Sequence, residues 1–154
     1  MVEFNKQYSI VTMPQYNINL LNKFYYEISV KQDLIKQDLI ISIGFGTIQV
    51  KLVDNILGWC KNSIGYNSFD GCVHNNYNQY YMGHYSYGDT IGAGIIDCNN
   101  NKYIILFTLN GKVILSINKN TKDKLIPMYG FNYPDMIDVI VPDQNVEFLN
   151  WIKE

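Results

Sequence analysis

The sequence contains no arginine, and its 12 lysines are outnumbered by 14 aspartates and glutamates, which gives a net charge of −2. Domains that bind nucleic acid electrostatically instead gather lysine and arginine on one face. No apolar run approaches the roughly 20 residues that a membrane-spanning helix requires, and the first ten residues lack the pattern of a secretory signal peptide. The sequence therefore argues against nucleic-acid and membrane partners.

Cysteine is scarce as well. The three cysteines, Cys60, Cys72 and Cys98, are an odd number in a chain without a secretory signal. Disulfides persist mainly in oxidising compartments, where cysteines usually occur in even numbers. We therefore expect free thiols and an intracellular protein of the cytoplasm or nucleus.

Residues that commonly carry catalysis or bind metal are few. The two histidines, His74 and His84, lie in neither a Gly-x-Ser-x-Gly nor a His-Glu-x-x-His context. Together with Cys60 and Cys72 they match none of the usual zinc-ligand spacings. Two Gly-x-Gly pairs occur, but no helix follows either of them to present its N-terminus to a phosphate. Apart from a pair of carboxylates, which leaves no local signature, no catalytic constellation is present. We predict a non-enzymatic protein without catalytic residues, metal or cofactor.

What the sequence does contain is enough apolar surface for one folded domain. Apolar residues make up 47% of the 154 residues, and a chain of this length buries roughly 70% of its unfolded surface without help from metal or disulfide. No long segment has the 3.6-residue period of an amphipathic helix. About ten short β-prone runs, closely spaced, predict an all-β antiparallel sandwich or barrel.

The clearest element is Gly88–Ile117, which predicts a three-stranded meander. Its strands are expected at Thr90–Asp97, Lys102–Leu109 and Lys112–Ile117. Asn110-Gly111 joins the last two strands and is the strongest short-range hairpin signal, because both turn positions need positive φ. A two-stranded ribbon is only marginally stable in water, so this meander must belong to a larger sheet.

The remaining strands are predicted over Tyr8–Thr12, Phe24–Val30, Leu39–Phe45, Ser63–Tyr66, Cys72–His74, Leu125–Gly130 and Ile137–Val141. Glycines inside the meander, Gly92 and Gly94, indicate that a neighbouring backbone or bulky side chain comes close. The Tyr- and Asn-rich segment Asn75–Tyr87 is expected to be an irregular surface excursion. Glu147–Lys153 is expected to form a terminal helical turn that packs back on the domain.

Several of these pieces occur in the order of a known family. They are Phe24–Val30 (FYYEISV), Ile43–Thr47 (IGFGT), Gly58-Trp59, Ser63–Tyr66 (SIGY), Phe69–Gly71 (FDG), Tyr87–Gly94 (YGDTIGAG), Phe107–Lys112 (FTLNGK) and Leu125–Phe131 (LIPMYGF). In this the chain resembles the SPRY domains, especially the type found in Ran-binding protein M and related ubiquitin-ligase scaffold proteins. The resemblance implies one domain over residues 1–154, with its core at about 8–141 and a C-terminal extension, 142–154, that packs back. It also implies a bent two-sheet antiparallel β-sandwich that binds other proteins and performs no chemistry.

The resemblance further implies a binding surface of loops at one end of the sandwich. Carried over by motif position, the residues expected to bind a partner are Gln49, Lys51, Leu52 and Asp54 from one loop, Phe131, Asn132 and Tyr133 from another, and Tyr16 beside them. Phe131 and Tyr133 would act as aromatic anchors, while Asn132 and Asp54 would pair with a peptide backbone. The two loops, although far apart in the sequence, are expected to lie side by side.

Two further sets of aromatic residues leave alternatives open. Tyrosines at positions Tyr77, Tyr80, Tyr81 and Tyr85 either form a protein- or glycan-binding surface or simply pack on their own domain. Trp59 could serve as a ligand platform, but we predict that it is largely buried at one end of the core.

These observations lead to one principal function and one alternative. We expect a module that recognises a short peptide segment of a partner protein, as an adaptor in ubiquitin ligation or in virus–host contact. The alternative is lectin-like glycan binding through the loop at 75–87. Heavy use of Asn, Ile, Lys and Tyr, whose codons are rich in A and T, suits an AT-rich protist or a large DNA virus, and host proteins would be partners in the viral case.

Overall fold

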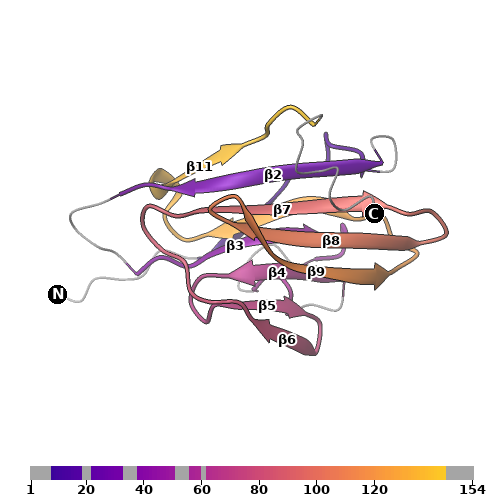
Figure 1. The fold of residues 1–154 in the computed structure, drawn as a ribbon, viewed down its shortest axis with the longest axis horizontal. Coiled ribbons are helices and arrows are strands. Elements are labelled where there is room, and N and C mark those ends of the chain that lie inside the picture. Colours follow the sequence, from indigo (N-terminus) through magenta and orange to yellow (C-terminus); the bar gives the residue numbers. More distant parts are fainter. Residues whose placement is uncertain (1–7, 19–21, 33–37, 51–55, 60–61, 145–154) are drawn as a thin grey trace.

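The computed structural model of this chain describes residues 8–18, 22–32, 38–50, 56–59 and 62–144. Lys51, Leu52 and Asp54 of the expected binding surface lie outside these ranges, as does the terminal turn expected at Glu147–Lys153. Two antiparallel sheets form the described part of the chain (Figure 1). No helix among the described residues has the length and apolar character needed to span a membrane.

The larger sheet, sheet A, has six strands in the spatial order β1 (Ser9–Thr12), β10 (Ile126–Phe131), β3 (Ile41–Gly46), β4 (Ser63–Asn67), β5 (Cys72–Asn75) and β6 (Asn78–Tyr81). Sheet B has five strands in the order β11 (Ile137–Ile140), β2 (Lys23–Val30), β7 (Thr90–Asp97), β8 (Lys102–Leu109) and β9 (Lys112–Asn120). A short 3-10 helix, η1 (Pro134–Met136), precedes β11. The predicted all-β sandwich is confirmed.

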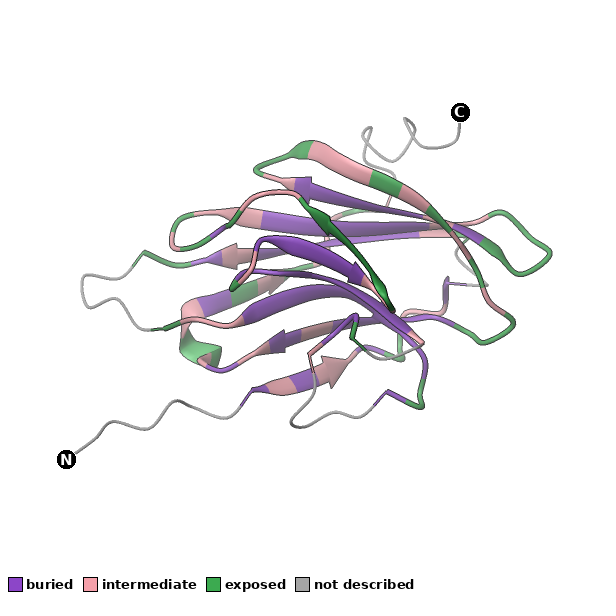
Figure 2. Cartoon of the chain, turned by 90° about the horizontal axis from the view of Figure 1, so that it is seen from below, coloured by how far each residue is buried: buried purple, intermediate pink, exposed green. Residues whose placement is uncertain are grey.

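The core lies between the two sheets, and the alternation of side chains along the strands produces it. In β2, Phe24, Tyr26, Ile28 and Val30 are buried and point into the sandwich. They meet inward residues of sheet A, and Figure 2 shows the purple buried stretches running along the facing strands. A period of two residues, with one face apolar, is what a half-buried strand requires.

One buried tyrosine ties the two sheets together. The Tyr26 hydroxyl, which comes from sheet B, lies 2.6 Å from the Gly44 carbonyl oxygen and 2.5 Å from the Met128 carbonyl oxygen in sheet A. It also accepts a hydrogen bond from the Gly44 N–H at 3.1 Å. Burial raises the pKa of Tyr26 far above its ordinary value, so the phenol stays neutral. A fully buried hydroxyl is tolerated here because it has partners on two strands.

The outer face of sheet A carries a second, smaller cluster. Its buried members are Tyr8, Ile10, Val50, Leu57, Ile126 and Met128. Val50 and Leu57 come from the connection between β3 and β4, so part of this connection covers the outside of the sheet. Sheet A is therefore buried on both faces near its centre.

The meander of β7, β8 and β9 forms as predicted. Asn110 and Gly111 have φ values of 51° and 82°, so both turn residues are in the left-handed region, as a type I′ turn requires. A side chain at Gly92 would collide with the hydroxyl groups of Tyr25 and Thr108, which explains the glycine there. The last strand is longer than expected and continues to Asn120.

The tyrosine-rich excursion is more regular than we predicted. Residues Asn78–Tyr81 form β6, which pairs with β5 and is the edge strand of sheet A. All four residues of this strand are exposed. The sequence therefore shows no alternation of apolar and polar residues that would predict a strand there. Asn76, with φ of 60°, supplies a turn between β5 and β6.

The prediction that Trp59 is buried is wrong, since its side chain is 52% exposed. Leu57, two residues earlier, is the residue that enters the outer cluster. Gly58 follows it with φ of 100° and donates its N–H to the Ser63 hydroxyl at 2.8 Å. This turn directs the chain outward. Trp59 therefore lies at the surface, and Leu57 packs in the outer cluster of sheet A.

The strand connections define two ends of the sandwich. One end, here named the pocket end, gathers the connections β2–β3, β4–β5, β6–β7, β8–β9 and β10–β11. The other end, named the far end, gathers the connections β1–β2, β3–β4, β5–β6, β7–β8 and β9–β10. The antiparallel pairing fixes this division, because each strand runs from one end to the other.

Candidate functional site: a pocket at one end of the sandwich

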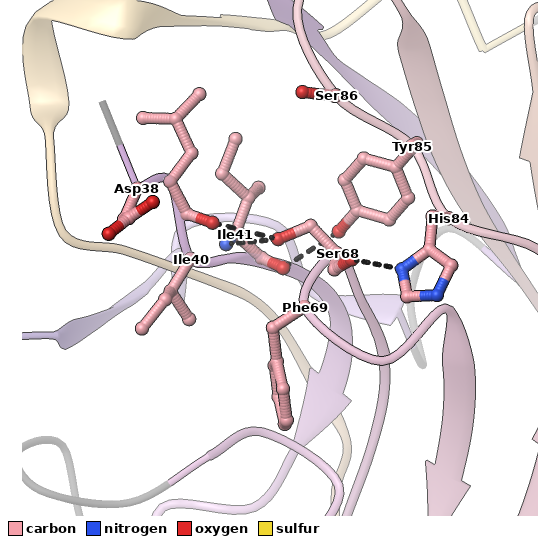
Figure 3. A pocket seen from close by; sticks show the side chains of 9 residues that line it. Asp38, Ile40, Ile41, Ser68, Phe69, His84, Tyr85 and Ser86 are labelled. Atoms are coloured by element: carbon pink, nitrogen blue, oxygen red, sulfur yellow. Dashed lines mark hydrogen bonds between the residues drawn. The ribbon is translucent and has the colours of Figure 1, made fainter. Parts of the chain in front are cut away.

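A concave pocket opens at the pocket end, where three connections meet. It is named the end pocket and is lined by Asp38, Leu39, Ile40, Ile41, Ser68, Phe69, His84, Tyr85 and Ser86. Its volume is about 450 Å³, within the range of small-molecule and side-chain binding pockets. Figure 3 shows Asp38 and His84 on opposite sides, with Ile41, Ser68 and the Tyr85 ring between them. Apolar and polar groups thus converge on one site.

Tyr85 forms a rigid part of the pocket wall. Its side chain is 3% exposed, and its hydroxyl lies 2.8 Å from the Ile41 carbonyl oxygen and 2.9 Å from the Tyr66 carbonyl oxygen. Its ring packs edge-on against Tyr66, with 4.8 Å between centroids. Burial raises the pKa of Tyr85 well above its ordinary value, so the phenol remains a neutral hydrogen-bond donor.

Ser68 and His84 form the polar side of the pocket. The Ser68 hydroxyl accepts the Ile41 N–H at 2.9 Å and so fixes the start of β3. His84 Nδ1 lies 3.1 Å from the Ser68 carbonyl oxygen. Because a carbonyl oxygen can only accept, Nδ1 carries the proton in this bond, and in the neutral ring Nε2 is an acceptor. The exposed His84 ring can therefore accept a hydrogen bond from a partner.

Asn132 holds the opposite wall in place. Its side-chain oxygen accepts the Ile40 N–H at 2.9 Å, and its side-chain nitrogen donates to the Asp38 carbonyl oxygen at 2.7 Å. The residue is only 2% exposed. Both functions of the amide are therefore used inside the protein, and Asn132 positions the segment 38–40 rather than facing a partner.

Asp38 is the acidic group of the end pocket. It is exposed and lines the pocket, while its backbone carbonyl is held by Asn132. Within the described ranges, no lysine lies within ion-pair distance of its carboxylate. The carboxylate is thus available to a cationic group of a partner.

Exposed aromatic rings adjoin the end pocket. Phe69 lines the pocket, is 43% exposed and packs edge-on against Trp59, with 6.1 Å between ring centroids. Trp59 packs in turn against His74 at 5.9 Å. We name Trp59 and Phe69 the aromatic pair. Large apolar rings that remain at the surface beside a pocket are typical of binding sites.

A partly buried hydrogen bond between His74 and Asp70 supports the aromatic pair. His74 Nε2 lies 2.5 Å from the Asp70 carboxylate, and the other carboxylate oxygen accepts the Cys72 N–H at 3.0 Å. His74 is only 6% exposed. Asp70 follows Phe69 directly, so this bond fixes both the loop that carries Phe69 and the imidazole on which Trp59 packs.

The structure does not place Gln49 beside Phe131. Gly46 at the end of β3 pairs with Ile126 at the start of β10, whereas Phe131 at the end of β10 pairs with Ile41. Gln49 follows β3 by three residues and is therefore near the far end, separated from Phe131 by about five residues of strand, or roughly 17 Å. For Gln49 the predicted juxtaposition is wrong, because antiparallel pairing places the ends of β3 and β10 at opposite ends of sheet A; Lys51, Leu52 and Asp54 lie outside the described residues.

The individual residues of that surface fall into two groups. Phe131 and Tyr133 lie at the pocket end, where the half-buried Phe131 ring stacks on Tyr129 at 5.9 Å. Tyr16 lies at the far end and packs against Phe24 at 4.7 Å. Of the predicted partner-binding residues, Phe131, Asn132 and Tyr133 thus belong to the same end as the end pocket.

The tyrosines of the alternative site are also divided. Tyr77 is 95% exposed at the far end, and Tyr81 is 64% exposed on β6. Tyr80 is 37% exposed, while Tyr85 is buried in the end pocket. They do not form one surface.

Sequence reasoning missed four residues that matter in the end pocket: Asp38, Ser68, Phe69 and His84. Phe69 belongs to the FDG motif, which marked the fold but not a site. The other three come from connections that meet only in the folded structure, and no local signal distinguishes them.

The described residues include no group of three His, Cys, Asp or Glu side chains that could hold a metal ion. Cys72 and Cys98 are free cysteines, and Cys60 lies outside the described ranges. The geometry of the end pocket therefore offers hydrogen bonds, apolar contact and one negative charge.

Comparisons with known proteins agree with this architecture. A family model for the SPRY domain matches residues 23–144. The chain is similar to the crystal structure of a human SPRY domain, with a TM-score of 0.68 and 22% identity over 94% of this chain and 89% of that one. It is also similar to the SPRY domain of human HERC1, with a TM-score of 0.59 and 16% identity over 94% of this chain and 87% of that one. The search of curated proteins found no match. Because the family model covers well over half of the chain, the protein belongs to the SPRY family, whose members are generally non-enzymatic protein-interaction modules.

Proposed function

We propose that this protein recognises a short peptide segment of a partner protein through the end pocket and the aromatic pair. The observation that carries the proposal is the junction of a pocket of about 450 Å³ with two exposed aromatic rings. A side chain of the partner would enter the pocket, and a neighbouring apolar residue would pack on Phe69 and Trp59. Aromatic anchors beside a pocket commonly supply most of the binding energy of an interface.

The rigidity of the site supports this function. The end pocket is built on the ends of β3 and β4, and its walls are fixed by the side chains of Ser68, Tyr85 and Asn132. A preformed site loses little conformational entropy when a partner binds. Loops held on a rigid scaffold are a common place for recognition.

Charge indicates the nature of the partner segment. Among the described residues, the pocket end carries the aspartates Asp38, Asp70, Asp89, Asp135 and Asp138 and the lysines Lys31 and Lys112. Lys31 is already paired with Asp138 at 3.7 Å. We propose that the partner segment includes a lysine or arginine that approaches Asp38, because complementary charge favours encounter and correct orientation.

Glycan binding is the second candidate, and the exposure of two tyrosines favours it. Tyr77 and Tyr81 present largely free rings, and a free aromatic ring can stack on a sugar. The two rings lie at different places along the β5–β6 hairpin. A glycan array tests glycan binding directly.

A peptide selection tests the principal proposal. We expect 12-residue peptides selected against the whole chain from a random library to be enriched in lysine or arginine next to an apolar residue. By calorimetry, Phe69→Ala should weaken binding at least about tenfold, as a hot-spot truncation does. Tyr77→Ala, which removes an exposed ring at the far end, is the matched control and should bind normally. Peptides whose affinity depends on Tyr77 and not on Phe69 would refute the site.

A further inference from the structure

A second pocket, of different character, lies at the far end. It is lined by Asn62, Asn76, Lys119, Asn120, Thr121, Lys122 and Asp123, and its volume is about 510 Å³. We name it the lysine pocket. It forms where the end of β9 in sheet B approaches the β5–β6 turn in sheet A, and its lining consists only of amide, hydroxyl and charged side chains.

Lys119 occupies a position that the strand pattern assigns to the interior. Leu115 and Ile117 pack against the core, and Lys119 is the next residue on the same face of β9. Its register partner, Tyr103, is 6% exposed and also faces the core. The lysine side chain therefore extends from sheet B toward sheet A at the far end of the sandwich, where it reaches Asn75.

The Lys119 ammonium group has no negative counter-charge in the described part of the chain. It donates one hydrogen bond, to the Asn75 side-chain oxygen at 2.7 Å, and the described residues place no carboxylate within 4.0 Å of it. Asp123 lines the same pocket but forms no ion pair with any described residue. Burial lowers the pKa of Lys119, which shows that the site disfavours an uncompensated positive charge. An ammonium group has three donors, so hydrogen-bonding capacity remains.

The positive charge continues beyond the lysine pocket. Lys122, Asp123 and Lys124 line an adjoining depression with Thr47, Ile48, Gln49 and Ile126, of about 300 Å³. Neither Lys122 nor Lys124 pairs with a carboxylate among the described residues. Three lysines and one aspartate thus border a continuous concave surface.

We propose that the lysine pocket binds a carboxylate side chain of an acidic protein segment. The ammonium of Lys119 would pair with the carboxylate, with the amides of Asn62, Asn76 and Asn120 nearby to donate hydrogen bonds. Lys122 and Lys124 would meet further acidic residues of the segment. A half-buried charge gains most from a partner of opposite sign in a site already partly shielded from water.

The donors favour a carboxylate over a phosphate. Phosphate sites typically use arginine forks, backbone N–H nests or helix N-termini. The chain has no arginine, and the lysine pocket is lined by a strand end and a hairpin turn. The partly buried Lys119 ammonium has neutral amide and hydroxyl groups around it, and the exposed Lys122 and Asp123 offset each other's charge. The lysine pocket thus carries one net positive charge, which suits a single negative charge.

Chemical-shift mapping on the isotope-labelled whole chain tests this assignment. The probe is a capped hexapeptide of alternating glutamate and glycine, and the neutral comparison replaces each glutamate with glutamine. At constant ionic strength, the glutamate peptide should shift the amide resonances of Asn62, Asn76 and Thr121, and the glutamine peptide should not. Lys119→Gln should weaken binding at least tenfold. Lys112→Gln, an exposed lysine at the opposite end, is the matched control and should bind as the natural chain does.

Three results would overturn the proposal. The first is the absence of shifts at the lysine pocket, which would leave Lys119 as an inward charge that protects an edge strand from pairing. The second is an equal loss in both variants, which would indicate general charge attraction. The third is tighter, Lys119-dependent binding of inorganic phosphate, which would replace the carboxylate. Lys122→Gln provides a second variant if Lys119→Gln fails to fold. Because the lysine pocket is at the opposite end, these outcomes are independent of the end pocket.

Discussion

Among single residues, the buried amide of Asn132 most directly links folding to the proposed site. It pairs with the backbone of Ile40 and Asp38 as a neighbouring strand would. We predict that Asn132→Ala lowers the free energy of unfolding by about 1–3 kcal/mol, because it leaves buried backbone groups unpaired. Urea denaturation measures this, with Asn118→Ala, an exposed position on β9, as the control. Equal stability of the two variants would show that the wall of the end pocket does not depend on Asn132.

Trp59 leads to a prediction of the opposite kind. Because about half of its side chain remains in water, Trp59→Ala should cost well under half as much stability as Phe107→Ala. Phe107 is fully buried, and truncation of such a residue costs about 3–5 kcal/mol. Paired denaturation curves compare the two. A cost for Trp59→Ala as large as for Phe107→Ala would mean that the tryptophan is structurally central after all.

These two residues show where sequence reasoning reaches its limit. Asn132 is expected from the sequence to pair with the backbone of a partner peptide, but its amide pairs instead with backbone groups 92 and 94 positions away in the chain. Trp59 is directed outward by the positive φ of Gly58, which composition alone does not reveal. In both cases the role depends on neighbours brought together by the fold.

At the scale of elements, the β8–β9 hairpin offers a direct test of turn chemistry. Gly111 has φ of 82°, and a residue with a Cβ pays about 1–2 kcal/mol in that conformation. We predict that Gly111→Ala lowers the free energy of unfolding by about this amount. Nothing lies within 4 Å of the position where its Cβ would be, so steric collision does not contribute. Lys112→Ala, next to it and exposed, should be nearly neutral; a neutral Gly111→Ala would contradict the type I′ turn.

Strands were predictable where one face is apolar, and positions of loops were not. The period-two alternation of Phe24–Val30 gave β2 to within one residue, and the turn signals on either side gave β7 and β8. β6 was missed because it is exposed throughout. Gln49 was placed beside Phe131 wrongly because its position depends on strand direction, and antiparallel pairing of β3 with β10 places the two residues at opposite ends.

At the scale of the whole molecule, buried tyrosines make stability sensitive to high pH. Burial raises the pKa of Tyr8 and Tyr66 to about 12, and it raises the pKa of five further tyrosines: Tyr25, Tyr26, Tyr85, Tyr103 and Tyr129. In the unfolded chain a tyrosine ionises near pH 10, so above that pH the unfolded state loses protons that the folded state keeps. Stability should be steady below about pH 9 and fall steeply as the pH rises from about 10 to 12.

Lys119 contributes with the opposite sign. Because its folded pKa is lowered, its contribution to stability rises with pH in the window just below the ordinary lysine value. It is one group, whereas seven tyrosines act in the opposite direction. Urea titrations at a series of pH values measure how the free energy of unfolding changes with pH. Phenolate absorbance gives a second signal. Ionisation of all 13 tyrosines near pH 10 in a chain that remains folded would contradict the buried, hydrogen-bonded tyrosines.

The charges of the molecule are divided between its ends. Among the described residues, the far end carries Lys23, Lys102, Lys119, Lys122 and Lys124 against Asp97, Asp123 and Asp143. The pocket end has the reverse balance. The net charge of the chain is only −2, so the composition does not reveal this division of charge between the two ends.

The most direct test of the central claim is to map a selected peptide onto the isotope-labelled chain by amide chemical shifts. The shifts should gather at residues 38–41, 68–69 and 84–86, and they should fade when Phe69→Ala and Asp38→Asn are introduced. Asp123→Asn, which changes the charge by the same amount at the far end, should leave them unaltered. Shifts confined to the far end or to β6, with those of the end pocket unmoved, would contradict the proposed recognition site.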